Sequence, residues 1–306
     1  MTWGLFFTQV LNGVQLGILL FLLAAGLTLV FGIMNFVNLA HGSLYMMGAY
    51  FAAAAFAATG SFTIAALVAI PATMLLGLIV ERVALMRLYA RDHLDQVLST
   101  FGLILFFNEV VRYFWGPSSI YMNAPAALSG QVNLFGLAYP SYRFAIIACG
   151  LAVAGGLYLL INRTRLGMLI RAGASNADMV SALGVDIRFL NSMVFAMGAG
   201  LAALAGLMSG PILSVQPGMG EPVLILTLVV IVTGGIGSIR GAFYGALIVG
   251  LVDTVGRAFL PAFLQMVIER SLAQAAGPAI ASMLIYLLMA VVLAVRPQGL
   301  FPVRHG

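Results

Sequence analysis

The sequence contains no lysine, a single cysteine and few charged residues of either sign. Only 8% of its 306 residues are charged, whereas about a quarter are charged in soluble domains. Hydrophobic residues make up 62% of the chain, and the mean hydropathy is +1.10. This composition excludes a soluble globular protein. With only Cys149, the chain forms no internal disulfide and no cysteine metal site.

Features of enzymes and of nucleic-acid-binding proteins are also missing. Without lysine there is no GxxxxGK[ST] phosphate loop. We find no Ser-His-Asp arrangement, no paired carboxylate site and no metal-ligand spacing, and the basic residues form no block interleaved with aromatics. The 16 methionines are dispersed along apolar stretches, as core-filling residues are. We therefore expect no catalytic residue, no metal site and no cofactor on this chain, and no nucleic acid as a partner.

Long apolar runs dominate what is present. A helix needs about 20 apolar residues to cross the hydrocarbon core. Nine segments meet or approach that length: 8–31, 36–58, 62–83, 96–115, 142–162, 191–213, 221–238, 241–260 and 278–296. The sequence therefore predicts an all-α, polytopic transmembrane bundle of about 8–9 spans, forming a single domain over 1–306. The two shortest segments predict a tight helical hairpin, a broken helix or a re-entrant pair.

The arginines set the orientation, because cytoplasmic connections carry an excess of basic residues. They gather in the connections 82–95 and 163–190 and, with Arg304, in the tail after 296. These regions share one side if every segment crosses. We therefore expect the N-terminus outside, the C-terminus inside and a periplasmic loop at about 116–141. No arginine precedes Arg82, so we expect the first apolar segment to be a retained helix rather than a signal peptide.

The outer connection is uncharged and rich in Gly, Pro, Ser and Asn. Its aromatic residues are typical of a belt at the membrane interface: Trp115, Tyr121, Tyr139 and Tyr142.

The inner connection, 163–190, is the longest polar stretch. Ser175 and Asn176 are good helix N-caps, and Asp178 would complement the dipole of a first helical turn. Met179, Val180 and Leu183 follow at helical spacing, and Gly184 supplies a stop. The pattern predicts a short amphipathic helix on the cytoplasmic face. Two roles are open for this segment. It is either a solvated connector or a coupling helix that docks into a groove on a partner.

Polar residues also occur around the start of the apolar segment 36–58. Asn35, Asn38 and His41 follow at i, i+3 and i+6, which on a helix gives a polar stripe. Polar groups at membrane depth face the bundle interior, a partner or a water-filled cavity. The stripe therefore predicts either hydrogen bonding between helices or part of a translocation path. Glycines nearby, including Gly42, permit close packing or a helix break.

A second glycine cluster, Gly234–Gly235 with Gly237 and Gly241, frees backbone groups at the inner end of a span. Irregular backbone at that depth must be buried in protein or line a cavity. We interpret Arg240 there as an anchor at the inner face rather than a substrate contact.

The carboxylates within spans are mostly provided with partners. Glu109 and Arg112 are spaced i, i+3, and Asp253 and Arg257 are spaced i, i+4, so each acid can pair on its own helix. Both pairs are interpreted as structural. Glu221 has no nearby arginine and lies at the outer mouth. Its candidate roles are contact with a binding protein, contact with the ammonium group of a substrate, and an exposed loop acid.

A weak internal repeat links the two halves of the chain. The residues 27–30 and 226–229 both read Leu-Thr-Leu-Val, and at the same offset 41–45 resembles 240–244. Transporters are commonly built from duplicated halves, and chance similarity of apolar sequence is the alternative.

Three motifs, in this order, carry a resemblance that covers essentially the whole chain: Gly32–Tyr50, Gly234–Ala242 and Arg296–Phe301. They resemble branched-chain amino-acid permeases of the LivH type, and the inner loop resembles that of ABC import permeases. The resemblance implies a permease subunit that works with two cytoplasmic ATPase subunits, a second permease, expected to be a different chain, and a periplasmic binding protein. ATP and Mg would be bound by the ATPase subunits. The expected location is the bacterial inner membrane, with several spans.

The resemblance assigns roles to particular residues. It implies coupling to the ATPase for Arg171, Ala172, Asp178, Ala182, Gly184 and Asp186. The residues expected along the translocation path are Asn35, Asn38, His41, Gly42, Gly234 and Gly235. Glu221 is the expected contact with the binding protein.

Substrate and energy source are where the alternatives lie. ATP-driven import of branched-chain or related small amino acids by alternating access is the leading hypothesis. A permease of the same family for urea, amides or other small neutral solutes is a second, because a path with few fixed charges does not select among them. A secondary transporter or channel without an ATPase is a third, and unpaired intramembrane carboxylates would favour it.

Overall fold

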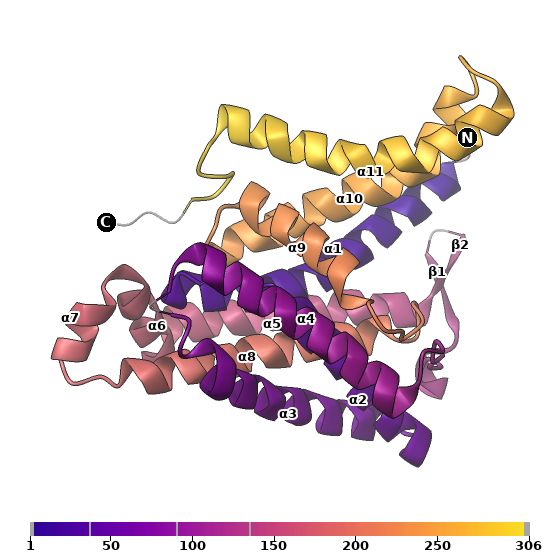
Figure 1. Ribbon diagram of the computed structural model, residues 1–306. Helices are drawn as coiled ribbons and strands as arrows, with labels where there is room; N and C mark the ends of the chain where they lie inside the picture. The colour runs from indigo at the N-terminus through magenta and orange to yellow at the C-terminus, as the bar shows by residue number, and fades with distance from the viewer. Residues whose placement is uncertain (1–2, 37, 90, 135, 303–306) are drawn as a thin grey trace. The chain divides into compact units, whose positions relative to one another are not determined.

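A computed structural model describes residues 3–36, 38–89, 91–134 and 136–302 (Figure 1). Arg304, used above for the orientation, lies outside these residues. Helices account for most of the described chain, so the all-α bundle is confirmed.

Each of the nine apolar segments has its own long helix. These helices are α1 (Trp3–Met34), α2 (His41–Thr59), α3 (Phe62–Val80), α4 (His93–Trp115), α5 (Ser141–Arg163), α8 (Ile187–Ser209), α9 (Gly220–Gly234), α10 (Ile239–Leu264) and α11 (Arg270–Val295). The inner loop contributes α6 (Arg165–Ser175) and α7 (Ala177–Ala182), and a π-helical turn, Glu81–Leu85, continues α3. The outer loop holds a 3-10 turn, Ala126–Leu128, and an antiparallel hairpin of β1 (Gln131–Leu134) and β2 (Leu137–Pro140), in which Val132 pairs with Tyr139.

Seven of the described helices are long and apolar enough to cross a membrane. They are α1, α3 with its π-helical turn, α4, α5, α8, α10 and α11. Helix α9, with 15 residues, extends only about 22 Å at 1.5 Å per residue, short of a core of about 30 Å. Helix α2 is not among the seven, and all residues from His41 to Tyr50 are buried.

The contacts divide the chain into two compact units. Among the described residues, one comprises 3–24, 126–151 and 226–302, and the other comprises 25–125 and 152–225. Helices α1, α5 and α9 contribute to both.

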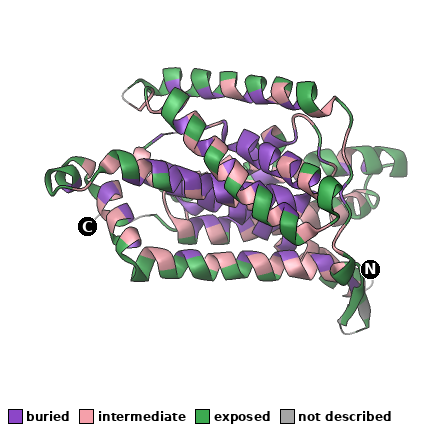
Figure 2. Ribbon diagram, turned by 90° about the horizontal axis from the view of Figure 1, so that it is seen from below, coloured by how far each residue is buried: buried purple, intermediate pink, exposed green. Residues whose placement is uncertain are grey.

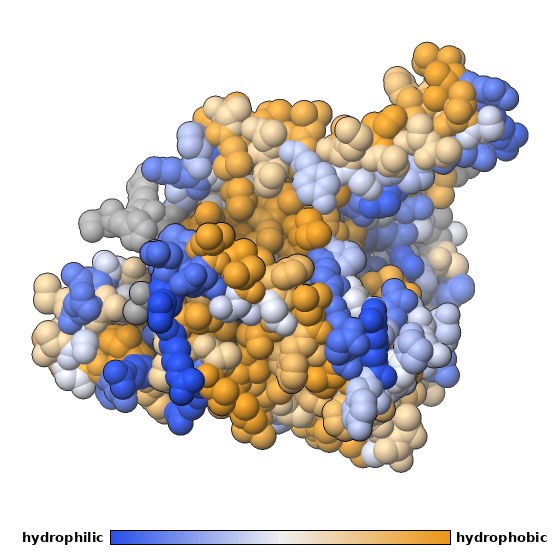
Figure 3. Space-filling model, viewed as in Figure 1, coloured by the Kyte–Doolittle hydropathy of each residue, from blue (hydrophilic) through white to orange (hydrophobic). Residues whose placement is uncertain are grey.

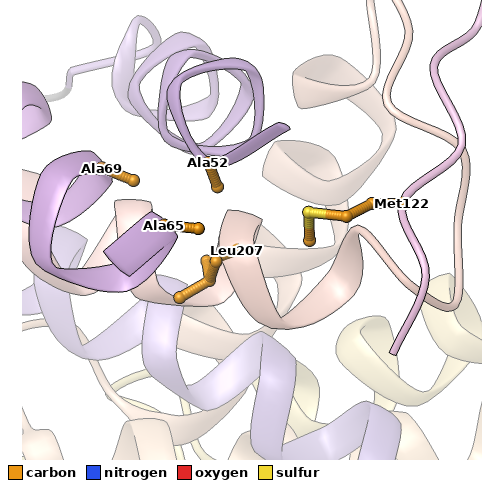
Figure 4. Packing of buried hydrophobic residues seen from close by; sticks show 5 residues of the cluster. All are labelled: Ala52, Ala65, Ala69, Met122 and Leu207. Atoms are coloured by element: carbon orange, nitrogen blue, oxygen red, sulfur yellow. The ribbon is translucent and has the colours of Figure 1, made fainter. Parts of the chain in front are cut away.

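In the unit of 25–125 and 152–225, helices α2, α3 and α8 pack on one another. Small residues permit this, since a Cβ on Gly77 would lie 2.7 Å from Ala199 Cβ. The Tyr45 hydroxyl also lies 2.6 Å from Ser209 Oγ, which links α2 to α8. Figure 4 shows part of the core, where three helices and the outer loop meet. Its members are Ala52, Ala65, Ala69, Met122 and Leu207.

In the other unit, α10 packs along α11, and the first half of α1 packs on α10. A Cβ on Gly17 would lie 2.8 Å from Ala246 O, so the two backbones are in contact there. Helices α9 and α10 form a tight hairpin. A Cβ on Gly245 of α10 would lie 2.8 Å from Val230 O of α9. This is the first of the three arrangements expected for 221–260.

Burial differs sharply among the spans. In α1 and α8, 78% and 72% of the most apolar window is buried, against 11–22% in the other five, which makes α1 and α8 interior helices. Figure 2 shows this contrast, with purple gathered on some helices and green along others.

Helix α4 shows what an outer face of the chain looks like. Leu98, Phe106 and Phe114 are exposed along its length, with hydrophilic residues toward its two ends (Figure 3). An exposed apolar helix face of this length suits contact with lipid or with another membrane subunit.

The proposed repeat has a counterpart in the secondary structure. Helix α1 ends at Met34 and α9 ends at Gly234, 200 residues later, while α2 and α10 begin 198 residues apart. Each copy is therefore a helix, a short break and a second helix.

Candidate functional site

The break between α1 and α2 overturns one expectation from the sequence. Helix α1 ends at Met34, and α2 begins only at His41, so Asn35, Asn38 and His41 share no helical face. Asn35 has a φ of +47° and its N–H donates to Phe31 O at 2.9 Å, closing the helix. Asn tolerates this left-handed conformation better than most residues. The prediction of a helical stripe was wrong because the period was counted across this turn.

The three residues nevertheless differ in a way that matters for function. Asn35 is exposed, whereas Asn38 and His41 are buried, with Asn38 only 1% accessible. Neither amide atom of Asn38 has a hydrogen-bond partner among the described residues, and the same holds for the hydroxyl of Thr28. Buried polar groups without partners are uncommon and costly. The amide of Asn38 is thus buried without the hydrogen bonds that would offset the cost of its burial.

The beginnings of α2 and α9 lie against each other. A Cβ on Gly42 would lie 2.7 Å from Gly220 O, so only glycine fits at the crossing. A narrow groove beside it is lined by residues of α2, α4 and α9, among them Ser43, Asn108 and Glu221. The groove leaves no space for a water molecule, so it is closed in this structure.

Glu221, in the first turn of α9, is only partly exposed. Its Oε1 accepts a hydrogen bond from Asn108 Nδ2 at 2.5 Å, and Asn108 Oδ1 accepts one from the Gly218 N–H at 3.1 Å. The sequence analysis missed Asn108. Its signal was a lone amide inside the apolar segment 96–115, overshadowed by the charged pair beginning at Glu109.

Gly234 and Gly235 lie at the turn between α9 and α10 and meet the third sequence motif there. Gly235 has a φ of +112°, and a Cβ on it would lie 2.9 Å from Phe301 O. The N–H groups of Leu300 and Phe301 donate to Thr233 O and Gly234 O, both at 2.9 Å. The motifs 234–242 and 296–301 therefore form one structural feature, which their separation in the sequence concealed.

The inner loop contains two helices where one was expected. Asn176 caps α7, accepting from the Met179 N–H at 2.9 Å, and Gly184 follows it with a φ of +88°. Ser175 is not a cap but the last residue of α6, which Thr164 caps through the Gly167 N–H at 3.1 Å. The longer helix was missed because its arginines and glycines were interpreted as connector.

The residues expected to couple to an ATPase lie along this loop. Five of the six lie on or next to the two short helices: Arg171 and Ala172 on α6, Asp178 and Ala182 on α7, and Gly184 after α7. The sixth, Asp186, caps α8 by accepting from the Phe189 N–H at 3.1 Å. All are exposed except Ala172, which is intermediate. Val180 is buried, while the apolar side chains of Met168, Met179 and Leu183 are exposed.

Close to this loop lies a buried carboxylate that the sequence analysis did not single out. Glu81 has no exposed surface and accepts hydrogen bonds from the hydroxyls of Tyr89, at 2.9 Å, and Ser192, at 2.8 Å. Burial, and secondarily the charge of Glu81, raise the pKa of Tyr89 above its ordinary value, so its phenol stays neutral. The only signal was an acid at the end of an apolar run, and the neighbouring Arg82 made it look like part of a charged connection.

A cavity of about 240 Å³ adjoins this carboxylate and is lined by Glu81, Tyr89, Arg188 and Asn191, among others. Asn191 Oδ1 is buried without a partner in the described part of the chain. The π-helical turn that holds Glu81 is a feature often found at functional sites.

Both expected ion pairs are present. Arg112 binds Glu109 at 2.8 Å on α4, and Arg257 binds Asp253 at 2.6 Å on α10. Arg257 also donates to Ser282 on α11 at 2.8 Å, so the second pair links two helices.

The expected aromatic belt is only partly present. Tyr121 is exposed, but Tyr139 and Tyr142 are buried. The Tyr139 hydroxyl bonds to Asn12 Oδ1 at 3.1 Å, and Arg143 bonds to the same oxygen. Burial raises the pKa of Tyr139, and Arg143 partly opposes that shift. Tyr139 therefore supports the packing of the outer loop on α1.

Comparison with known proteins decides the family. Residues 9–293 match the model described as branched-chain amino acid transport system / permease component. The chain belongs to this permease family. It is 32% identical over 266 residues to the high-affinity branched-chain amino acid transport system permease protein BraD of Pseudomonas aeruginosa, covering 81% of this chain and 85% of BraD.

Other relatives show how far the permease family extends. LivH of Escherichia coli, of the same described function, is 31% identical over 83% of this chain and 87% of its own length. The fructose import permease protein FrcC of Rhizobium meliloti is 32% identical over 102 residues, 31% of this chain and 28% of its own. No solved structure matches the chain significantly. The permease is thus a multi-pass membrane protein and a transport component.

Proposed function

We propose that this permease is the membrane-spanning subunit of an ATP-driven importer for branched-chain or related small amino acids, acting by alternating access in the bacterial inner membrane. The names of BraD and LivH, each similar over more than four fifths of the chain, support the substrate class. FrcC, a sugar permease, is similar over only a third of it. Permeases for urea, amides or other small neutral solutes of the same family are the alternative.

The proposed orientation places the N-terminus outside and the C-terminus inside, with 1–306 acting as one permease domain. It follows from the arginines at 82–95 and 163–190. ATP and Mg would be bound by two cytoplasmic ATPase subunits, so this chain itself would carry no cofactor and catalyse no hydrolysis. A second permease, expected to be a different chain, and a periplasmic binding protein complete the proposed assembly.

The observation that carries the coupling role is the exposed apolar surface of α6 and α7. Met168, Met179 and Leu183 are exposed on a loop that the arginine distribution predicts to be cytoplasmic. Well-placed caps at Thr164 and Asn176 hold both short helices in shape. An exposed, ordered apolar surface of this kind fits a groove on another protein.

The experiment that tests this function is purification of the chain in mild detergent, followed by reconstitution. We expect an ATPase and a second permease to co-purify. We also expect proteoliposomes with the binding protein to take up labelled leucine only when ATP is supplied. Leucine uptake by the permease alone, driven by an ion gradient, would instead establish the secondary transporter. ATP-driven uptake of urea or an amide, without leucine, would redirect the substrate.

A further inference from the structure

Glu221 is held by hydrogen bonds that contact with a binding protein, its expected role, does not require. Its carboxylate points toward α4, where Asn108 Nδ2 donates to it at 2.5 Å. Asn108 is fixed in turn by the Gly218 N–H, which donates to its Oδ1 at 3.1 Å. A carboxylate meant for a docking protein would be presented outward, whereas this one closes a groove between helices.

The negative charge of Glu221 has no counterpart in the described chain. Among the described residues Arg112 pairs with Glu109 and Arg257 with Asp253, and Glu221 takes part in neither pair. Arg112 lies one turn from Asn108 on α4, yet it pairs with its helical neighbour instead. A partly buried carboxylate held by a neutral amide is therefore available to a cation.

The groove at this carboxylate connects elements that the transport path is expected to involve. Gly42 and Ser43 of α2 line it together with Gly220 and Glu221 of α9 and Asn108 of α4. The glycine pair at the crossing keeps α2 and α9 in contact, and the groove has no space for water. The groove is therefore too narrow for a solute in this structure, and the bond between Asn108 and Glu221 joins two of the helices that line it.

We propose that Glu221 receives the ammonium group of the transported amino acid, and that Asn108 occupies the carboxylate while the groove is closed. This assignment rests on the proposed function. An ammonium group adds a full positive charge to its hydrogen bond with the carboxylate, so this ion pair is stronger than the bond that a neutral amide donates to the same carboxylate. The substrate therefore takes the place of Asn108 Nδ2 at Glu221, while Asn108 keeps the bond that its Oδ1 accepts from the Gly218 N–H. The bound substrate opens the groove that excludes water in its absence.

Glu221→Gln is the decisive variant, because glutamine keeps the length of the side chain and an oxygen that accepts from Asn108 but loses the charge. The matched control is Glu109→Gln. Glu109 follows Asn108 on α4, and this variant removes its charge from an exposed ion pair. Both are assembled with the ATPase, second permease and binding protein in proteoliposomes. Leucine uptake, ATP hydrolysis and the binding-protein concentration for half-maximal ATPase stimulation are then measured.

We expect Glu221→Gln to transport at least tenfold less leucine per ATP, with the half-maximal binding-protein concentration unchanged, while Glu109→Gln behaves as wild type. A normal ratio of leucine to ATP in Glu221→Gln would overturn the proposal. An increased binding-protein concentration with a normal ratio would overturn it too, and would assign Glu221 to docking. The wild type separates the two hypotheses, because failure of the proposed function removes its leucine uptake altogether.

A second pair of variants covers failure of Glu221→Gln to assemble. Glu221→Asp and Glu221→Asn have side chains of equal length and differ in charge. Leucine uptake by the aspartate variant but not by the asparagine variant supports an ammonium site. Equal uptake by both variants contradicts it.

Discussion

Ser192, in the second turn of α8, donates a hydrogen bond of 2.8 Å to the Glu81 carboxylate at the end of α3. Helix α8 begins directly after the inner loop that carries α6 and α7. The bond therefore joins the first element after the proposed coupling loop to a span whose body packs along α8. A movement of the start of α8 relative to the end of α3 would strain or break this contact.

The buried carboxylate gives the first prediction. Glu81→Ala removes the acceptor of the buried Ser192 hydroxyl, at about 1–3 kcal/mol for a buried unsatisfied group, and that of the partly buried Tyr89 hydroxyl. We expect the apparent Tm of the detergent-solubilised protein to fall by several degrees. Glu109→Ala, which removes an exposed pair worth about 0–1 kcal/mol, should change it little. Equal Tm values for the two variants would contradict a stabilising role for Glu81.

A second prediction concerns the close approach of α1 and α8. A Cβ on Gly26 would lie 2.7 Å from Gly198 O and 2.9 Å from His41 Nε2, and the carbonyl cannot move without its helix. Gly26→Ala should therefore destabilise the protein by about 1–3 kcal/mol, as overpacking does, and lower the yield of monodisperse protein in size-exclusion chromatography.

The matched control for that substitution is Gly102→Ala on α4, where an added Cβ meets nothing within 4 Å. It should keep or slightly raise the stability, because alanine favours helix over glycine. If both alanine variants elute with wild-type yield, α1 and α8 do not pack as closely as described.

How much of this was predictable follows from what apolar sequence encodes. The nine long helices could be located because burial in lipid requires continuous apolar runs, and the two ion pairs because i, i+3 and i, i+4 spacing is local. The boundary between the segments 8–31 and 36–58 was located as well, but not that the second helix begins only at His41, because a helical period gives no sign of a single residue in the left-handed region. Helix α6 of the inner loop was missed because its arginines and glycines were interpreted as a connector.

Contacts between distant segments were beyond the sequence for a different reason. The bonds of Asn108 to Glu221 and of Ser192 to Glu81 join residues 113 and 111 positions apart. Only the packing of helices brings such residues together, and a single sequence carries no periodicity that reports it. The burial of Tyr139 was mispredicted for the same reason, since its partner Asn12 lies on α1.

The third prediction tests the coupling loop. Gly184→Arg places a long cation beside the exposed apolar residues of α7, and we expect it to abolish ATPase-coupled uptake while membrane insertion is retained. Gly184 has a φ of +88°, so any side chain strains the turn, although an added Cβ there meets no atom within 4 Å. Gly184→Ala is therefore the control for strain, and should retain most of the uptake. Wild-type uptake by the arginine variant would remove Gly184 from the coupling surface.

The last prediction separates stability from transport at one residue. Asn38 is buried, and its amide has no partner among the described residues, so the folded protein gains nothing from the polarity of this side chain. Asn38→Leu should therefore leave the apparent Tm unchanged or raise it, because a buried unsatisfied amide is replaced by an apolar side chain of similar size. If the amide instead meets the substrate along the path, leucine uptake should fall while stimulation of the ATPase by the loaded binding protein persists. Thermal unfolding and uptake are measured on the same preparation, with Asn35→Leu as the exposed control. A lower Tm would show that Asn38 is structural, and unchanged uptake kinetics would exclude it from the path.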